Sequence, residues 1–358
     1  MKLTAEETSQ YSRHLSLEEV GERGQLKLKQ AKVLVIGAGG LSCPALQYLV
    51  AAGVGTIGIV DNDRVDKTNL QRQILYTIED IGKYKVETAV SRLKKLNPFI
   101  QLNSYITKLS NDNALDLFEN YDIIVDGTDN FPTRYLINDA AVILGKAVVF
   151  GSINKFEGQV SVFNYHNGPT YRCLFPTPPS PELVPNCSEA GVLGILPSII
   201  GSLQANEVLK IILGLGNILS GKLLTFNALT LKQETFHFKK NPSLAIASLA
   251  QDYPKFCGLD DGFEEITYQD YLQQADAFNL LDVRSKAERE KLYFESFHIP
   301  LNELEVRYTE LTANKPLLVI CKSGGRSKLA IKILESKNYE NKLVSLKGGL
   351  AEGYKIMS

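Results

Sequence analysis

Short apolar runs separated by amphipathic stretches fill the first 240 residues of the chain. Apolar residues occupy 33–36, 56–60 and 121–125 almost without interruption, which is typical of strands buried on both faces of a sheet. Residues 85–96 instead repeat apolar side chains at helical spacing and end at Asn97-Pro98. Because strand and helix signals alternate, the pattern predicts an α/β domain. Further strands are predicted at 147–152, 158–164, 223–229 and 234–239, and further helices at 9–28, 44–52 and 197–213.

The pattern changes between residues 241 and 261, where Pro242, Pro254 and Gly258 interrupt the periodicity. Beyond this boundary, apolar runs at 278–283 and 317–320 predict two strands, and residues 328–336 predict a helix. We therefore expect two domains, residues 1–252 and residues 263–358, joined by a linker at 253–262.

Three glycines directly follow the first predicted strand. Gly37, Gly39 and Gly40 separate it from a helix, and a strand, a glycine turn and a helix N-terminus together form a site for an anion. The next strand ends at Asp61, at about the spacing where a carboxylate meets a ribose hydroxyl. Ser42 stands where a dinucleotide-binding turn has its third glycine. The pattern therefore favours a mononucleotide; the alternative is a tight packing turn that binds nothing.

Polar residues cluster where the predicted strands end. A charge-mixed loop at 63–73 follows the second strand, at the edge where open α/β sheets bind ligands. Lys83 and Lys85 lie at the first turn of a helix, the unfavourable end for a cation, so a nearby anion would account for them; ordinary surface lysines are the alternative. Asp126 and Asp129 follow the third strand, and two carboxylates together with nucleotide phosphates suit Mg²⁺.

Two cysteines stand in positions that favour reactivity. Cys187 follows a proline-rich stretch at 168–185 and precedes a long apolar helix, whose N-terminus would favour the thiolate. Cys321 follows a buried strand and opens a glycine loop, in which backbone N–H groups and Arg326 can hold an anionic sulfur species. The same loop could bind phosphate. A buried structural cysteine is the alternative at both positions, although at Cys321 it would require neither the glycines nor the arginine.

Composition excludes several classes of protein. The 358 residues include 39 basic and 40 acidic side chains, so no excess of positive charge indicates nucleic acid as a direct partner. Residues 1–10 lack the apolar segment of a signal peptide, and the longest apolar run, around 192–200, contains Pro197 and is too short to span a membrane. Five scattered cysteines do not form a secreted disulfide framework. We expect a cytoplasmic protein with no membrane partner.

The chain also carries seven motifs in this order: Ser12-Arg13-His14, Gly37-Ala38-Gly39-Gly40-Leu41, Thr68-Asn69-Leu70-Gln71-Arg72-Gln73, Lys85-Val86-Glu87, Thr128-Asp129-Asn130, Cys187-Ser188-Glu189-Ala190-Gly191 and Cys321 to Ser327. With these motifs the chain resembles, over essentially its whole length, the MoeB/ThiF family of ubiquitin-activating-enzyme-like adenylyltransferases, fused to a rhodanese-like domain. The resemblance implies a Rossmann-like mixed β-sheet with flanking helices in the adenylating domain, followed by a smaller α/β rhodanese-like domain.

The family implies a substrate and a reaction. The C-terminal Gly-Gly carboxylate of a small ubiquitin-like sulfur carrier would attack the α-phosphate of ATP, giving an acyl-adenylate and pyrophosphate. By resemblance, Asp129 would hold Mg²⁺, and Arg13 would reach into the site of a neighbouring subunit, which implies a homodimer. The other implied nucleotide contacts are Gly40 on the phosphates, Asp61 on the ribose, and Asn69, Arg72 and Lys85 on the triphosphate, with Gly37, Gly39, Asp63, Gln73 and Asn130 completing the set.

The resemblance makes the second domain the source of sulfur. Cys321 would be loaded as a persulfide by a donor such as a cysteine desulfurase, would attack the activated carbonyl, and would yield a thiocarboxylate after reduction. Cys187 would be a covalent partner, as a thioester or an acyl disulfide, and the sequence leaves open which. Related phosphatases have a loop one residue longer than the six residues from 321 to 326, which favours sulfur over phosphate.

Family members carry a structural zinc on two C-x-x-C pairs, and this chain departs from that pattern. The first pair reads Thr170-Tyr171-Arg172-Cys173 and the second Pro254-Lys255-Phe256-Cys257. Threonine and proline cannot replace thiolates in a tetrahedral zinc site, so we expect ATP and Mg²⁺ but no structural zinc. The two remaining cysteines could still lie close together through packing.

Three other functions compete with this one. An NAD-dependent oxidoreductase conflicts with Ser42 and with the polar loop at 63–73. An adenylating dehydratase that acts on a modified tRNA base conflicts with the balanced charge and with the second domain. A binding scaffold conflicts with the intact loop at Cys321. The sequence does not select the pathway that the carrier serves, whether molybdopterin, thiamin, tRNA thiolation or cysteine supply.

Overall fold

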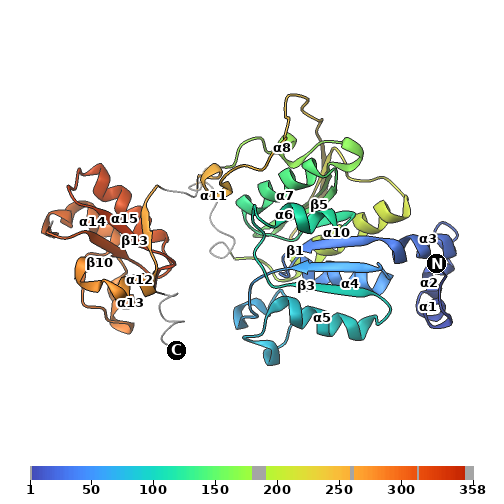
Figure 1. Ribbon diagram of the computed structural model, residues 1–358, viewed down its shortest axis with the longest axis horizontal. Coiled ribbons are helices and arrows are strands. Elements are labelled where there is room, and N and C mark those ends of the chain that lie inside the picture. Colours follow the sequence, from blue (N-terminus) through green and yellow to red (C-terminus); the bar gives the residue numbers. More distant parts are fainter. Residues whose placement is uncertain (1, 180–190, 259–261, 313, 351–358) are drawn as a thin grey trace. The chain divides into compact units, whose positions relative to one another are not determined.

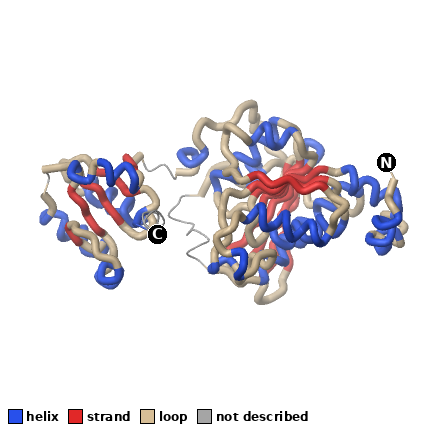
Figure 2. Tube along the Cα trace, turned by 60° about the horizontal axis from the view of Figure 1, so that its bottom comes forward, coloured by secondary structure: helices blue, strands red, loops and turns tan. Residues whose placement is uncertain are grey.

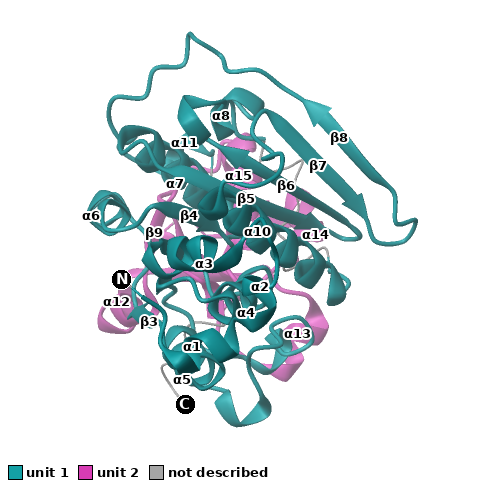
Figure 3. Ribbon diagram, turned by 90° about the vertical axis from the view of Figure 1, so that its right-hand side faces the viewer, with its two compact units in different colours: residues 1–259 teal, residues 260–358 magenta. Residues whose placement is uncertain are grey.

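The computed structural model describes residues 2–179, 191–258, 262–312 and 314–350. The chain divides into two compact units, residues 1–259 and 260–358 (Figure 3). The division falls within the stretch 253–262. At the start of that stretch, α11 (Tyr253–Phe256) packs against α7 (Phe131–Ile143), which makes α11 part of the first unit.

A mixed sheet forms the centre of the first unit. Its strands are β1 (Lys32–Ile36), β2 (Thr56–Val60), β3 (Gln101–Tyr105), β4 (Ile123–Asp126), β5 (Ala147–Asn154), β6 (Glu157–Phe163), β7 (Lys222–Asn227) and β8 (Gln233–His237). Their order is β3-β2-β1-β4-β5-β6-β7-β8, parallel from β3 to β5 and antiparallel from β5 to β8. The Rossmann-like mixed sheet is thus as predicted. The strand order reverses between β1 and β4, where open α/β sheets bind ligands.

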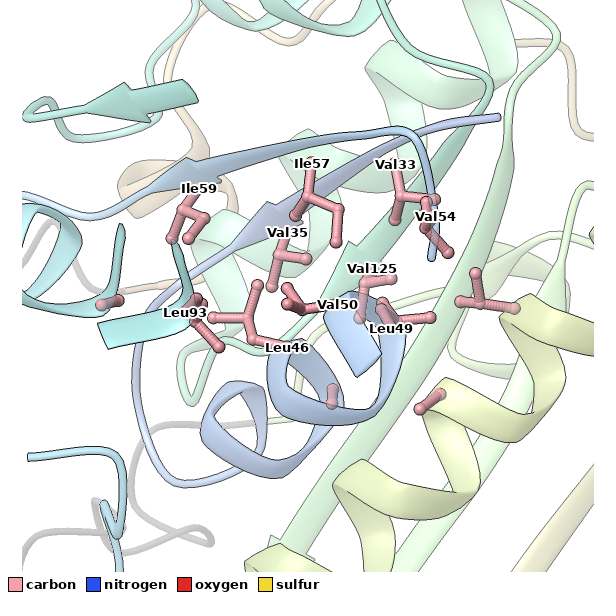
Figure 4. Close-up of a cluster of buried hydrophobic side chains, with 14 of the residues drawn as sticks. Val33, Val35, Leu46, Leu49, Val50, Val54, Ile57, Ile59, Leu93 and Val125 are labelled. Atoms are coloured by element: carbon pink, nitrogen blue, oxygen red, sulfur yellow. The ribbon is translucent and has the colours of Figure 1, made fainter. Parts of the chain in front are cut away.

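Helices cover both faces of this sheet (Figure 1; Figure 2), which explains the uninterrupted apolar runs in its parallel strands. Val33 and Val35 of β1 point toward α4 (Ser42–Ala52), where they meet Leu46 and Leu49 (Figure 4). Leu34 and Ile36 point the other way, into a second cluster that includes residues of α6 (Ala114–Glu119) and α7. The period of two along the strand therefore builds two cores from one run.

The N-terminal segment corrects one prediction. The single helix expected at 9–28 is three helices: α1 (Ala5–Gln10), α2 (Ser12–Leu15) and α3 (Gly21–Gln30). The chain turns at 16–20, where the N–H of Gly21 bonds the carbonyl of Leu17 at 2.8 Å. Gly21 has a φ of +52°, which a glycine adopts without strain. The apolar residues keep helical spacing across this turn, and residues 16–19 contain neither glycine nor proline that would predict it.

Strand β3 was not predicted. It contains Gln, Asn and Ser, and it lies at the edge of the sheet with only partly buried side chains, so it lacks the apolar signal of the central strands. The other helices of this unit with described ends are α5 (Lys85–Leu96), α8 (Tyr171–Leu174) and α10 (Ile195–Leu213).

Helix α10 is long and apolar enough, by length and composition, to cross a membrane. Here it packs against α4, β5 and β6, and its buried residues include Gln204 and Glu207. Gln204 donates hydrogen bonds to the carbonyl oxygens of Asp126 and Val149, at 2.7 and 3.2 Å. These contacts make α10 a core helix of the first unit.

The second unit is a five-stranded parallel sheet with helices on both faces. Along β12, Leu317, Val319 and Cys321 enter one core, and Leu318 and Ile320 enter the other. Its strands, in sheet order, are β11 (Phe297–His298), β10 (Asn279–Asp282), β12 (Leu317–Ile320), β13 (Leu343–Leu346) and β9 (Glu264–Ile266). Its helices are α12 (Tyr268–Gln273), α13 (Lys286–Lys291), α14 (Leu301–Arg307) and α15 (Gly325–Ser336).

Candidate active sites

A cavity of about 310 Å³ opens in the first unit where β1, β2 and β4 end. It lies at the reversal of strand order between β1 and β4, the position expected for a nucleotide. Ten of the eleven residues predicted to bind the nucleotide line this cavity: Gly37, Gly39, Gly40, Asp61, Asp63, Arg72, Gln73, Lys85, Asp129 and Asn130.

The glycine turn has little room for side chains. Gly37 has a φ of +89°, and a Cβ there would lie 3.0 Å from the carbonyl oxygen of Gly127. A Cβ on Gly40 would lie 3.1 Å from Pro197. A Cβ on Gly127 would lie only 2.0 Å from the hydroxyl of Ser42. Ser42 therefore packs against the loop after β4. This close contact requires glycine at position 127 of that loop, while position 42 holds a serine.

Asp61 fixes the turn from the end of β2. One carboxylate oxygen accepts a hydrogen bond from the N–H of Ala38 at 2.7 Å, and the other accepts one from the N–H of Asp63 at 2.7 Å. The carboxylate lines the cavity while holding both loops. Because each carboxylate oxygen has a second lone pair, Asp61 can also accept a hydrogen bond from a ligand hydroxyl.

The two lysines at the start of α5 have carboxylate partners. The ammonium group of Lys85 lies 2.8 Å from Asp63, and both residues line the cavity. Lys83 instead pairs with Asp80 at 3.3 Å, and neither residue lines the cavity. Only Lys85 is therefore placed to meet an anionic ligand there.

Asp126 and Arg134 fix the loop after β4 through hydrogen bonds to Thr128. Asp126 is buried, and its carboxylate accepts hydrogen bonds from the N–H and the hydroxyl of Thr128 at 2.9 and 2.6 Å. Burial raises the pKa of Asp126, opposed by the nearby charge of Arg134. Arg134 also donates a hydrogen bond to the carbonyl of Thr128 at 3.0 Å. Asp129 follows this fixed segment and faces the cavity, with no hydrogen bond or ion pair to any described residue.

The walls of the cavity suit a polar ligand. The side-chain oxygen of Gln73 and the Nε of Arg134 are buried and have no hydrogen-bond partner among the described residues. Unsatisfied buried polar atoms are costly, so these two favour a ligand that supplies an acceptor and a donor. Lys85, Arg72 and Lys108 add positive charge, and Asp129 adds a carboxylate. These donors fit a triphosphate, and the free carboxylate fits its Mg²⁺.

Three predicted residues take supporting or distant positions. Asn69 ends the 3₁₀ turn η1 (Lys67–Asn69), does not line the cavity, and accepts a hydrogen bond from the N–H of Asp66 at 3.2 Å. Asn130 lines the cavity, but its side chain caps α7 through the N–H of Thr133 at 3.0 Å. Arg13 is exposed on α2 and does not line the cavity of its own chain.

Sequence reasoning missed several lining residues. Thr107 and Lys108 follow β3, and parallel strands present their carboxyl ends at one edge, so assigning β3 would have found them. Arg134 lies in the first turns of α7, among apolar residues of that helix. Val192 and Pro197 come from distant sequence and carry no local signal.

Cys321 forms the candidate site of the second unit. Its side chain is fully buried, at 0% exposure, because it follows β12 on the face of Leu317 and Val319, which packs in one core with residues of α15. The sulfur accepts a hydrogen bond from the N–H of Gly324 at 3.1 Å. Gly324 has a φ of +92°, which curls the loop around the sulfur. One backbone N–H of the expected nest, that of Gly324, bonds the sulfur, and the thiol itself lies 3.7 Å from the hydroxyl of Ser327. The thiol lies deeper than an exposed nucleophile.

Arg326 does not point freely at the sulfur. Its guanidinium makes two hydrogen bonds of 2.7 Å to Glu288, from α13. Deeper in the fold, Arg284 pairs with Asp282, and both residues are buried. The two arginines around this loop are therefore each matched by a carboxylate.

The positions of the family's zinc pairs hold different chemistry. Arg172 makes two hydrogen bonds of 2.7 Å to Asp139, and Tyr253 donates a third to the same carboxylate at 2.8 Å. The guanidinium lies 4.8 and 4.5 Å from the ring centres of Tyr135 and Phe256. This ionic cluster joins α8, α7 and α11.

The two remaining cysteines of these pairs have different surroundings. The sulfur of Cys173 accepts hydrogen bonds of 3.3 Å from the N–H groups of Thr170 and Asn241. Burial raises the pKa of Cys257 to about 11. No group of three or more metal-binding side chains occurs among the described residues, and two thiols alone do not fit tetrahedral zinc. Cys187 lies outside the described residues.

Comparison with known proteins agrees with this arrangement. Residues 11–246 match the ThiF family and residues 267–355 match the rhodanese-like domain. The chain therefore belongs to the ThiF family, and it carries a rhodanese-like domain, as the motifs predicted.

Its relatives span both domains. The chain is 41% identical, over 99% of its length and 95% of the relative, to "Probable adenylyltransferase/sulfurtransferase MoeZ" of Mycobacterium tuberculosis. It is 42% identical, over 98% of its length and 87% of the relative, to "Adenylyltransferase and sulfurtransferase MOCS3" of Aedes aegypti. It is 50% identical, over 72% of its length and 100% of the relative, to "Sulfur carrier protein adenylyltransferase" of Thermus thermophilus.

Among solved structures, Escherichia coli MccB has the same fold as the first unit. The complex of MccB with MccA-N7isoASN superposes with a TM-score of 0.59 at 23% identity, covering 67% of this chain and 74% of MccB. At this level of identity the likeness shows the fold alone.

Proposed function

We propose that this protein adenylylates the C-terminal glycine of a small ubiquitin-like sulfur carrier and then transfers sulfur to it from Cys321. The observation that carries the proposal is the cavity at the β1/β4 reversal, where Lys85, Arg72 and the unpaired Asp129 surround the glycine turn. The relatives named adenylyltransferase and sulfurtransferase share both domains, which supports the two-step reaction over an oxidoreductase or a tRNA dehydratase.

The first step needs positioning and positive charge more than proton transfer. The N–H groups of Gly37 and Ala38 already donate to Val60 and Asp61, so the phosphates would be bound by the N–H groups from Gly39 to the start of α4. Asp61 would accept a hydrogen bond from the ribose. Lys85 and Arg72 stabilise the charge that moves onto pyrophosphate as the carboxylate attacks the α-phosphate. Asp129 would hold Mg²⁺, which would supply positive charge to the phosphates. The product is a carrier acyl-adenylate.

The second step moves sulfur without an external oxidant. The terminal sulfur of a Cys321 persulfide attacks the activated carbonyl, the new C–S bond forms, and AMP leaves with the electron pair. A thiol then cleaves the S–S bond of the acyl disulfide and leaves the thiocarboxylate. Cys187 is the proposed covalent partner, as a thioester or in the acyl disulfide. The persulfide is loaded by a donor such as a cysteine desulfurase.

The protein is proposed to act as a cytoplasmic homodimer without membrane or nucleic-acid partners and without structural zinc. Arg13 is exposed on its own chain, which suits a role in the neighbouring subunit's cavity. Mixing the Arg13→Ala and Asp129→Ala proteins should then restore about a quarter of the activity, since half of the random dimers keep one complete site. A mixture as inactive as its components would contradict a shared site.

Pyrophosphate release tests the proposed reaction. The protein is incubated with ATP, Mg²⁺ and candidate carriers that end in Gly-Gly, with a carrier lacking the last glycine as the control. Release should require the intact carrier terminus. Turnover that ignores the carrier and responds to tRNA would instead support the dehydratase.

A further inference from the structure

The rim of the Cys321 loop carries a paired charge that the sulfur-transfer reaction does not by itself require. Arg326 lies in the first turn of α15, and both of its terminal nitrogens bond the two carboxylate oxygens of Glu288 at 2.7 Å. The side chains are 36% and 32% exposed, so the pair sits at the surface of the loop.

Glu288 is itself held in place. It is the third residue of α13, and Ser285 donates to it from its N–H and its hydroxyl, both at 3.0 Å. The N–H of Glu288 donates back to the hydroxyl of Ser285 at 3.3 Å, which completes a capping box. The hydrogen bonds from Arg326 lower the pKa of Glu288 to about 2, so the carboxylate is ionised at neutral pH. The partner of Arg326 is therefore a fixed, permanent anion.

This pairing determines what charge the loop offers to a sulfur donor. The charge of Arg326 is matched by Glu288, and that of the buried Arg284 is matched by Asp282. Lys322 is the one loop cation without an ion-pair partner among the described residues, and it is exposed. A small dianion such as thiosulfate depends on free positive charge, whereas a protein persulfide carries at most one charge on its sulfur and gains contact area from its own surface.

We propose that Glu288 determines the class of sulfur donor at Cys321: it orients Arg326 across the rim, cancels its charge, and so favours protein-bound persulfide over small dianionic donors. The inference rests on the proposed role of Cys321 in sulfur transfer. Glu288 acts through Arg326, so it is a positioning residue.

Both transfers balance without a further reactant. With thiosulfate, the Cys321 thiolate attacks the outer sulfur, a new S–S bond forms, and the old S–S bond breaks with its electron pair leaving on sulfite. With a protein persulfide, the thiolate attacks the terminal sulfur and the donor cysteine leaves as a thiolate. Thiosulfate and a protein persulfide therefore differ in the charge that they bring to the loop, while the bonds formed and broken at Cys321 are of the same kind.

Glu288→Gln tests the proposal in the full-length protein. Glutamine also completes a capping box, so the variant removes the charge and keeps the start of α13. Glu303→Gln is the matched control: Glu303 is 34% exposed and bonds Arg307, which is 36% exposed, in the same unit. Thiosulfate with cyanide as the acceptor provides the dianionic donor, and a cysteine desulfurase with cysteine provides the protein donor.

The KM for thiosulfate should fall roughly three- to tenfold in Glu288→Gln, with kcat changed less than about twofold, because one charge at a half-exposed site is worth this much. The rate at which the desulfurase loads Cys321 should not rise in Glu288→Gln. The fall in the KM for thiosulfate should be smaller at high salt, which screens exposed charges. Glu303→Gln should behave as the wild type.

An unchanged KM for thiosulfate in folded Glu288→Gln, an equal gain in Glu303→Gln, or thiosulfate turnover in neither protein would overturn the inference. These results differ from failure of the proposed function. That failure would appear as sulfur transfer by the wild type that persists in Cys321→Ala.

Discussion

The ammonium group of Lys85 lies 2.8 Å from the carboxylate of Asp63 at the wall of the cavity between β1 and β4, and the lysine is buried, with 5% exposure. A buried lysine needs a charge partner, and Asp63 provides one from an exposed position. A triphosphate that enters the cavity can therefore take over the lysine while Asp63 moves into solvent. The pair keeps the cation in place at the cavity wall.

Lys85→Met should lower kcat/KM for carrier-dependent pyrophosphate release by roughly 100- to 1,000-fold, as expected for the loss of one preorganised charge at a transferring phosphate. Asp63→Asn should cost less than about tenfold, because the lysine remains. Lys83→Met is the matched control, since Lys83 pairs with Asp80 outside the cavity, and its activity should equal the wild type. Equal losses in both lysine variants would contradict the assignment.

Gly127→Ala should destabilise the first unit by about 1–3 kcal/mol and weaken ATP binding, because the new Cβ would overlap the hydroxyl of Ser42. Adding Ser42→Gly removes that hydroxyl and should recover part of the loss. Recovery remains partial because the carbonyl oxygen of Ile36 would still lie 3.1 Å from the Cβ. Thermal unfolding and ATP titration of the four proteins measure the coupling. If the two substitutions changed the free energy of unfolding additively, the Cβ at position 127 and the hydroxyl of Ser42 would not be in conflict.

Arg172→Met should lower the free energy of unfolding of the first unit by about 3–5 kcal/mol, because it leaves the buried carboxylate of Asp139 without its cation. The measurement is calorimetric unfolding of the full chain, in which the two units can melt separately. Treating the wild type with a chelator should leave its unfolding temperature unchanged, and elemental analysis should find no stoichiometric zinc. Bound zinc whose removal lowers that temperature would show that the ionic cluster does not replace the metal.

The Glu288–Arg326 pair should make the second unit sensitive to acid. The folded pKa of Glu288, about 2, lies below the ordinary value of 4.5, so the pair stabilises the fold fully above about pH 4.5 and progressively less as pH falls toward 2. Hydrogen exchange of α13 and α15 should be slower in the wild type than in Glu288→Gln at pH 6. The difference should narrow as pH falls from 4.5. A difference that stays constant would indicate that the charge of Glu288 contributes nothing.

Much of this fold was readable from local pattern. β1, β2 and β12 coincide with their apolar runs, and the glycine turn between β1 and α4 predicted where the cavity lies. These features are encoded within a few consecutive residues.

The features that the sequence did not predict depend on contacts between residues that are distant in sequence. Glu288 meets Arg326 from 38 residues away, and Asp139 meets Arg172 from 33 residues away, so no window of sequence contains both partners. The depth of Cys321 follows from the cover that α15 places over it, and the apolar run alone does not reveal which helix packs on which face of β12.

The most direct test of the central claim compares Asp129→Ala and Cys321→Ala in three assays: carrier-dependent pyrophosphate release, thiocarboxylate formation on the carrier by mass spectrometry, and thiosulfate:cyanide transfer. Asp129→Ala should lose pyrophosphate release and retain thiosulfate:cyanide transfer. Cys321→Ala should retain pyrophosphate release and lose the thiocarboxylate. If both variants kept pyrophosphate release and thiocarboxylate formation, the cavity at Asp129 and the buried thiol of Cys321 would not act in one reaction.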